Sequence, residues 1–163
     1  MKTNKIAFLG MFTALAMIFS YIETLIPPLV AYPGIKLGLA NIAIIVILYK
    51  TGWKEAVAVS LIRVVLSSMM FSTLLSMLYS LAGAILSLIA MIILKKLKLS
   101  KITISVVGGV FHNIGQILVA ILMTETAEIM YYLPILLFTG TISGIIIGLI
   151  ASMTVKKLEK FRF

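Results

Sequence analysis

The sequence predicts an all-α integral membrane protein whose six transmembrane helices form one bundle with both termini in the cytoplasm. Hydrophobic residues make up 62% of the 163 residues, and the mean hydropathy is +1.21. Both values lie far above those of a soluble domain. The chain also divides into apolar segments of about the length that a spanning helix needs. Its basic residues stand in short clusters at the ends of those segments, which indicates membrane topology and not nucleic-acid binding.

The first expected span begins after Lys2 and Lys5, and its apolar run resembles a signal peptide. No small-x-small cleavage site follows the run, so we expect an uncleaved helix. The second expected span is short, and the third carries Arg63. The stretch from Lys54 to Lys95 is too long for one helix and suits two, with a turn near Ser72-Thr73. The six expected spans form a single domain over residues 1–163: 6–23, 36–50, 54–71, 73–95, 102–123 and 130–155.

The basic residues orient these spans. With both termini inside, 12 of the 14 basic residues fall on the cytoplasmic side, which satisfies the positive-inside rule. Lys36 falls outside and Arg63 falls within the membrane. The twelve are Lys2, Lys5, Lys50, Lys54, Lys95, Lys96, Lys98, Lys101, Lys156, Lys157, Lys160 and Arg162.

The external loop over residues 24–36 contains Pro27-Pro28 and Pro33-Gly34. Proline pairs stop helices and favour extended or turn conformations. We therefore expect this loop to form a lid over a pocket.

Small residues follow two helix faces. Gly140, Gly144 and Gly148 recur at every fourth position of the last span, and Gly10 and Ala14 do the same in the first. Such faces let helix backbones approach closely. Packing within the bundle explains both, while contact with another subunit is an alternative for the first.

Polar groups within the spans mark the candidate site. Arg63 lies midway along the third span, and His112, Asn113 and Gln116 lie midway along the fifth. Ionisable groups at this depth are costly and usually functional. The alternatives are an ion pair between Arg63 and Glu23, and a purely structural His112. Counted along the spans, the polar groups lie between the midplane and the outside, with almost none in the cytoplasmic half. That layout predicts a pocket entered from outside, and its cationic bias suits an anionic or carbonyl-rich ligand.

Most enzymatic chemistry is excluded. The chain has no Asp, only five Glu, no Cys and one His. These residues do not supply the carboxylate cluster that Mg²⁺ needs or the ligand set of a zinc site. No Walker motif occurs. We therefore expect no metal, no cofactor and no catalytic residue.

Several stretches, in order and over nearly the whole chain, form a specific pattern: Glu23-x-x-Ile26-Pro27-Pro28, Pro33-Gly34-Ile35-Lys36-Leu37-Gly38-Leu39-Ala40-Asn41, Arg63, Ser80-Leu81-Ala82-Gly83-Ala84 and His112-Asn113-Ile114-Gly115-Gln116. This pattern resembles the Gx transporter family, also catalogued as heptaprenyl diphosphate synthase component I. That family is similar to the substrate-binding (S) components of energy-coupling factor importers. The resemblance implies six helices in the cytoplasmic membrane, a small-molecule substrate, a transmembrane T component and two ATPase subunits. It also implies that the T component contacts Gly10 and Ala14.

The leading hypothesis is thus a substrate-binding subunit of such an importer, which captures a small amphipathic or anionic micronutrient from outside. The alternative is a non-catalytic membrane accessory subunit of prenyl diphosphate synthesis, since prenyl synthases resemble one another in aspartate-rich Mg²⁺ sites that this chain lacks. Uptake by this chain without ATPases is a third possibility. The expected substrate-binding residues are Glu23, Lys36, Asn41, Arg63, Ser80, His112, Asn113 and Gln116.

Overall fold

The structure is a computed structural model that describes residues 2–25, 38–125 and 127–160. Its described residues are helical, as the sequence predicts. The six α-helices and two short 3₁₀-helices are α1 (Lys2–Leu25), α2 (Asn41–Lys50), α3 (Trp53–Phe71), α4 (Leu74–Lys96), α5 (Lys101–Thr124), η1 (Ala127–Tyr132), α6 (Leu133–Lys157) and η2 (Leu158–Lys160).

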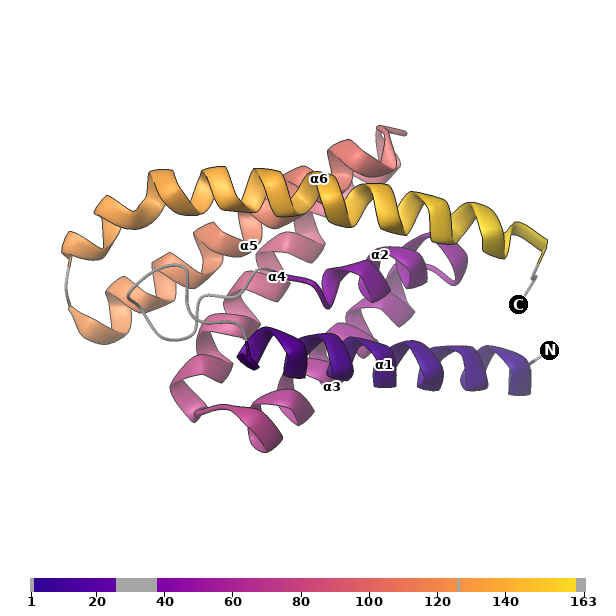
Figure 1. Ribbon diagram of the computed structural model, residues 1–163, viewed down its shortest axis with the longest axis horizontal. Coiled ribbons are helices and arrows are strands. Elements are labelled where there is room, and N and C mark those ends of the chain that lie inside the picture. The colour runs from indigo at the N-terminus through magenta and orange to yellow at the C-terminus, as the bar shows by residue number, and fades with distance from the viewer. Residues whose placement is uncertain (1, 26–37, 126, 161–163) are drawn as a thin grey trace.

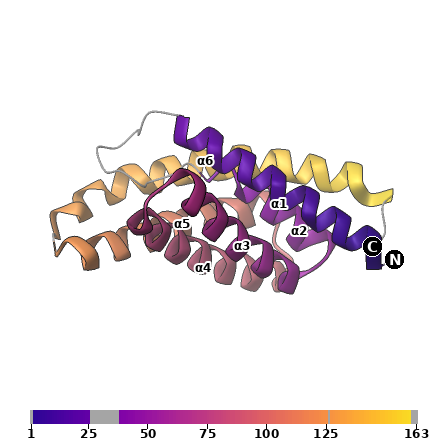
Figure 2. The ribbon, with the colours of Figure 1, turned by 90° about the horizontal axis from the view of Figure 1, so that it is seen from below.

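Helices α1 and α6 run along the long axis of the bundle, and α1 begins at the same end where α6 finishes (Figure 1). Seen from the side, α1 and α6 lie along one face and α3 and α4 along the other, with α2 between them (Figure 2). Helix α2 packs against α1, α3 and α6, whereas α5 packs mainly against α4 and α6. Each residue of α2 from Asn41 to Leu48 is buried. The short helix is therefore the centre of the fold.

The second helix is shorter than the sequence suggested. It was expected over residues 36–50, but α2 begins at Asn41 and has ten residues. Gly38 has a φ of +85°, a left-handed conformation that glycine adopts at low cost and that a helix cannot include. Its carbonyl accepts a hydrogen bond of 2.8 Å from the Asn41 N–H, which forms a turn. Ten residues rise about 15 Å, roughly half of a ~30 Å hydrocarbon core.

The other helix boundaries follow local sequence signals. Gly52, with a φ of +126°, separates α2 from α3. The expected turn at Ser72-Thr73 is confirmed, and the Thr73 hydroxyl caps α4 by accepting the Ser76 N–H at 3.2 Å. Ser100 caps α5 in the same way through the Thr103 N–H, at 3.0 Å. Pro134 lies in the first turn of α6, where its missing N–H costs nothing.

Helix α3 buries several polar side chains together with apolar ones and exposes large apolar side chains, unlike a helix on a soluble protein. Ser60, Arg63 and Ser67 are buried, while Ile62 and Met69 are exposed. Lipid around the bundle explains this arrangement, because an outward apolar face is then the favourable one. Four other stretches of the described chain are long and apolar enough to cross a membrane: Thr3–Leu25, Leu74–Lys96, Lys101–Thr124 and Ala127–Lys160.

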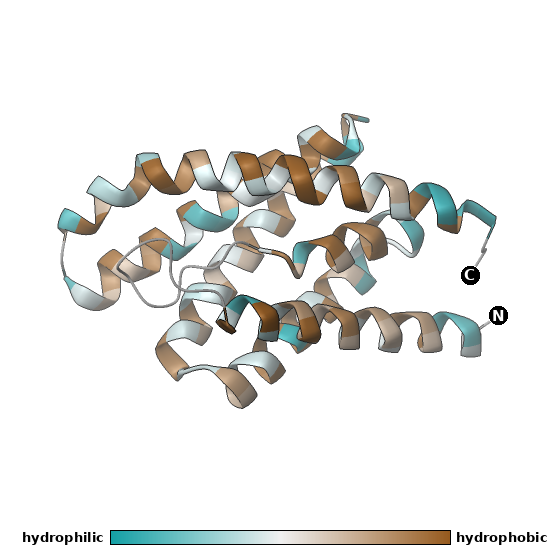
Figure 3. Cartoon of the chain, viewed as in Figure 1, coloured by the Kyte–Doolittle hydropathy of each residue, from teal (hydrophilic) through white to brown (hydrophobic). Residues whose placement is uncertain are grey.

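The basic residues gather at one end of the bundle, where the ribbon is hydrophilic (Figure 3). Lys5 of α1 forms an ion pair with Glu55 at the start of α3. Lys50 Nζ donates to the Leu158 carbonyl at 2.6 Å, and Lys95 Nζ donates to the Leu48 carbonyl. These contacts join the basic ends of all the α-helices except α5. Such grouping is what the positive-inside prediction requires, although the cytoplasmic assignment of this end stays a prediction.

The glycine stripe of α6 packs within the bundle, which confirms the expected role of these glycines in helix packing. A Cβ added at Gly144 would lie 2.6 Å from the Val106 Cα of α5, and one at Gly148 would lie 2.8 Å from the Ile102 Cα. A Cβ at Gly140 would lie 2.7 Å from the Asn113 amide nitrogen. These helices therefore touch backbone to backbone, and no larger residue fits between them.

Candidate functional site

Arg63 lies at the centre of the first polar group. Its guanidinium donates through Nη1 to the Ser20 hydroxyl of α1 at 3.3 Å, and through Nη2 to the Asn41 amide oxygen of α2 at 3.5 Å. All three side chains are at least 93% buried. Three helices thus meet on one permanent positive charge. Arg63 Nε forms no hydrogen bond within the described part of the chain.

Glu23 lies one turn beyond Ser20 on the same side of α1 and is also buried. Its carboxylate accepts a hydrogen bond of 2.7 Å from the Leu39 N–H and attracts the Arg63 guanidinium electrostatically. Glu23 therefore ties the turn before α2 to the end of α1. This attraction is what the alternative of an Arg63–Glu23 ion pair requires. The ion pair and ligand binding at Arg63 both stay predictions.

Two predictions cannot be placed. Lys36 and residues 26–37 of the expected lid lie outside the described residues. Thr24 and Leu25, which were expected to open the loop, belong to α1.

His112 belongs to a second polar group, between α5 and α4. It is buried, and a Cβ added at Gly83 of α4 would lie 2.9 Å from its Nδ1. Gly83 is thus the residue against which the imidazole packs, and Gly115 approaches the same glycine equally closely. The sequence placed Gly83 in a motif but did not single it out.

Ser80 and Gln116 lie one turn further along from this contact, on α4 and α5 respectively. Because the two helices are antiparallel, both positions lie on the side away from the basic end. Both side chains are buried. The structure therefore brings Ser80, His112 and Gln116 to the interface between α4 and α5.

Buried polar side chains at the interface between α4 and α5 extend further toward the basic end than predicted. Ser87 of α4 and Ser105 of α5 are also buried, and the Ser87 hydroxyl lies close to Gly108. The prediction that almost no polar group lies in the half nearer the basic end is therefore wrong for these two serines. Single serines are weak signals in an apolar helix because their hydroxyls can bond to their own backbone.

Asn113 points away from both groups. Its amide nitrogen donates to the Leu136 carbonyl of α6 at 2.6 Å. Adjacent residues on a helix face different directions, so Asn113 cannot share the surface of His112. We interpret Asn113 as a clamp between α5 and α6, and its expected role in substrate binding stays a prediction.

The two remaining groups contain one fixed cation, one carboxylate and several neutral donors and acceptors. No cluster of three or more His, Asp or Glu side chains occurs among the described residues, so nothing there resembles a metal site. Ser20 is the contact that sequence reasoning missed. Its spacing of three from Glu23 on one helix face was the available signal.

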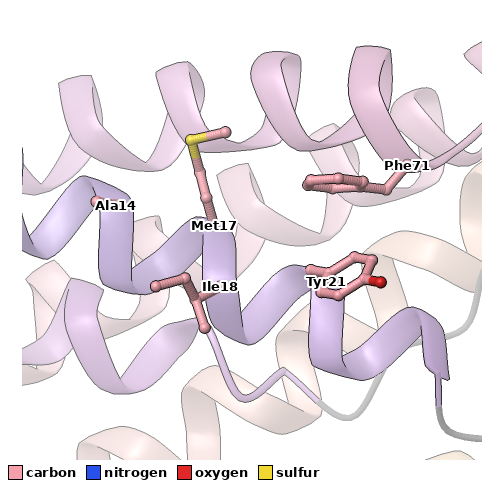
Figure 4. Close-up of a pocket in the computed structure, with 5 residues that line it drawn as sticks. All are labelled: Ala14, Met17, Ile18, Tyr21 and Phe71. Carbon is pink, nitrogen blue, oxygen red and sulfur yellow. The ribbon is translucent and has the colours of Figure 1, made fainter.

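The outer face of α1 carries the two residues expected to contact a partner. Gly10 and Ala14 are both exposed, and a Cβ at Gly10 would meet nothing within 4 Å. Gly10 lines a groove of about 410 Å³ against α3. Ala14 lines a second, apolar groove of about 360 Å³, where the Tyr21 and Phe71 rings pack at an angle of 50° with centroids 4.9 Å apart (Figure 4).

Comparison with known proteins gives one family. No curated protein and no solved structure matches the chain. The family described as heptaprenyl diphosphate synthase component I matches residues 12–154, which is most of the chain and includes every polar group described above. The chain therefore belongs to the heptaprenyl diphosphate synthase component I family.

Proposed function

We propose that this chain is a non-catalytic membrane subunit that binds a small amphipathic or anionic molecule on behalf of partner proteins. The observation that carries the proposal is Arg63. It is a permanent charge, 95% buried, held by two neutral oxygens and left with a free Nε–H donor within the described residues. Burying such a charge is costly, and an anionic ligand would offset the cost.

The first candidate role is an accessory subunit of prenyl diphosphate synthesis. The family description favours it. A prenyl diphosphate combines a charged head with a long apolar tail, which suits a guanidinium within an apolar bundle. The chain has no Asp to hold Mg²⁺, so in this role the chemistry belongs to a partner.

The second candidate role is the substrate-binding subunit of an energy-coupling factor importer. The position of Ser20 and Glu23 supports it, because both lie in the last turns of α1, away from the basic end and so in the predicted outer half. Arg63 contacts Ser20 from the middle of α3. The exposed small-residue face of α1, with Gly10 and Ala14, offers a close-packing surface for a T component, which would couple the chain to two ATPases. The family description supports the first role more directly than this one.

The binding proposal is tested by purifying the chain in mild detergent and identifying any co-purifying small molecule by mass spectrometry. We expect one amphipathic anion in the wild type and at least tenfold less in Arg63→Ala. Lys156→Ala is the control, because it removes one positive charge from an exposed position at the basic end. Retention of the ligand by folded Arg63→Ala would contradict the proposal.

The two roles are separated by the partners that co-purify. The accessory role predicts a soluble prenyltransferase, and the importer role predicts a T component with ATPases. Gly10→Leu should weaken capture of the T component, because the bulky side chain fills the surface that the partner would approach. If neither set of partners is found and the chain alone transports the ligand into liposomes, both roles are wrong.

A further inference from the structure

The turn between α4 and α5 contains four lysines, of which two contact a neighbouring helix. Lys95, Lys96, Lys98 and Lys101 fall within seven residues, and no acidic residue occurs between Glu55 and Glu125. Lys95 and Lys101 lie beside the Tyr49 ring, with Nζ 5.0 and 5.4 Å from its centroid. These two lysines hold the turn against the end of α2.

Lys96 and Lys98 remain exposed at the tip of this turn. Neither forms an ion pair within the residues that the structure describes. Lys98 has a φ of +57°, a left-handed conformation that normally favours glycine. Backbone geometry alone therefore does not explain a lysine at this position. Next to it, the Ser100 and Thr103 hydroxyls lie 2.7 Å apart on the exposed first turn of α5. The turn therefore offers two exposed cations and two hydroxyls on one small surface.

An apolar groove lies directly below the turn, on the outer surface between α4 and α5. It has a volume of about 230 Å³ and includes Leu86, Ala90 and Leu94 of α4 with Val107 and Phe111 of α5. Ile93 also lines the groove, and it lies three residues before Lys96 on the same face of α4, so the groove begins one turn below Lys96. From Leu94 to Leu86 it extends about 12 Å along the helix toward the middle of the bundle.

We propose that this surface binds one anionic phospholipid, with its phosphate at Lys96 and Lys98 and an acyl chain in the groove. Charge complementarity selects an anion, and clusters of four or more lysines at a helix end attract acidic headgroups. The groove selects a lipid over a soluble acidic protein, because it lies along two membrane-spanning stretches, where only an apolar chain can reach. This site is separate from the Arg63 group and does not depend on the function proposed above.

The test uses native mass spectrometry of the purified chain titrated with phosphatidylglycerol, phosphatidylcholine of the same acyl chains, or inorganic phosphate. We expect one tightly bound phosphatidylglycerol and at least tenfold weaker phosphatidylcholine. The double variant Lys96→Gln/Lys98→Gln should weaken phosphatidylglycerol binding roughly tenfold to thirtyfold, as loss of two lysines near a headgroup implies. Lys98→Gly removes one charge and relieves the left-handed backbone, so it should weaken lipid binding without loss of stability.

Two controls make the test specific. Lys156→Gln/Lys157→Gln removes the same charge from the same end of the bundle and should change lipid binding less than twofold. Ala90→Phe fills the groove without a change of charge, so it should weaken phosphatidylglycerol and leave inorganic phosphate unaffected. The proposal is overturned if both lysine pairs act equally, if Ala90→Phe has no effect, or if phosphate binds as tightly as the lipid. It is also overturned if Lys96→Gln/Lys98→Gln abolishes capture of a soluble protein while lipid binding persists.

Discussion

Individual polar side chains in this bundle fall into two kinds, which their contacts distinguish. Asn113 is satisfied by one carbonyl of the neighbouring helix, at 2.6 Å, and so has a sufficient structural role. Within the described residues, Arg63 donates to the side-chain oxygens of Ser20 and Asn41 and is attracted by Glu23. A charge costs about 2.5–3.5 kcal/mol at the centre of a membrane helix by insertion scales, far more than a neutral amide contact returns. This imbalance is the reason to place a ligand at Arg63 and not at Asn113.

Asn113→Ala should lower the free energy of unfolding by about 0.6 kcal/mol and by no more than ~1.7 kcal/mol, the usual range for hydrogen bonds between membrane helices. Reversible unfolding in mixed micelles measures this change. Asn4→Ala, at an exposed position of α1, is the matched control and should be neutral. If Asn113→Ala instead kept its stability and lost the co-purified ligand, Asn113 would belong to the binding site.

At the scale of helices, glycines at α4–α5 and α5–α6 contacts serve close packing, whereas Gly10 on α1 does not. Gly83 supports the His112 imidazole, and Gly144 lies against the α5 backbone. Gly10 has open space where a side chain would be. Glycine therefore serves helix packing on α4 and α6, whereas on α1 it leaves a surface available.

Gly83→Ala should destabilise the protein by about 1–3 kcal/mol, since the new methyl group would lie 2.7 Å from the His112 carbonyl oxygen and force α4 and α5 apart. Gly10→Ala should be neutral or slightly stabilising, because alanine favours the helix and meets no neighbour within 4 Å. Thermal unfolding in detergent compares the two variants directly. Equal losses of stability would show that α1 packs against the rest of the bundle through Gly10.

For the whole molecule, the helix directions place the basic clusters at one end and the α5–α6 connection at the other. Ser100 marks the first end and Tyr131, which is 83% exposed, marks the second. The positive-inside rule assigns Ser100 to the cytoplasm and Tyr131 to the outside. This assignment also places the Arg63 group nearer the outer surface, which the importer role requires.

The absence of native cysteine allows single-cysteine labelling. Tyr131→Cys should react with an impermeant maleimide on intact cells, and Ser100→Cys should react only after permeabilisation. Labelling is read by the mass shift of the purified chain. The opposite pattern would reverse the orientation and remove the importer role, while the lipid site would then lie in the outer leaflet.

The sequence by itself determined that the chain is helical, that it belongs in a membrane and that its basic residues share one end. These properties depend on composition and on charge at segment ends, which act locally. It also identified Arg63 and the His112 run, because polar residues are conspicuous in apolar helices.

Only the tertiary structure decided what those residues contact. It shortened the second helix to a ten-residue buried core, because the turn at Gly38 and burial on all sides are not visible in an apolar run. In the structure, His112 packs against Gly83 of α4 and Asn113 donates to the Leu136 carbonyl of α6, although His112 and Asn113 are adjacent in sequence. Which neighbour a helix face meets depends on the packing of helices far apart in the chain, and periodicity along one helix contains no information on that choice.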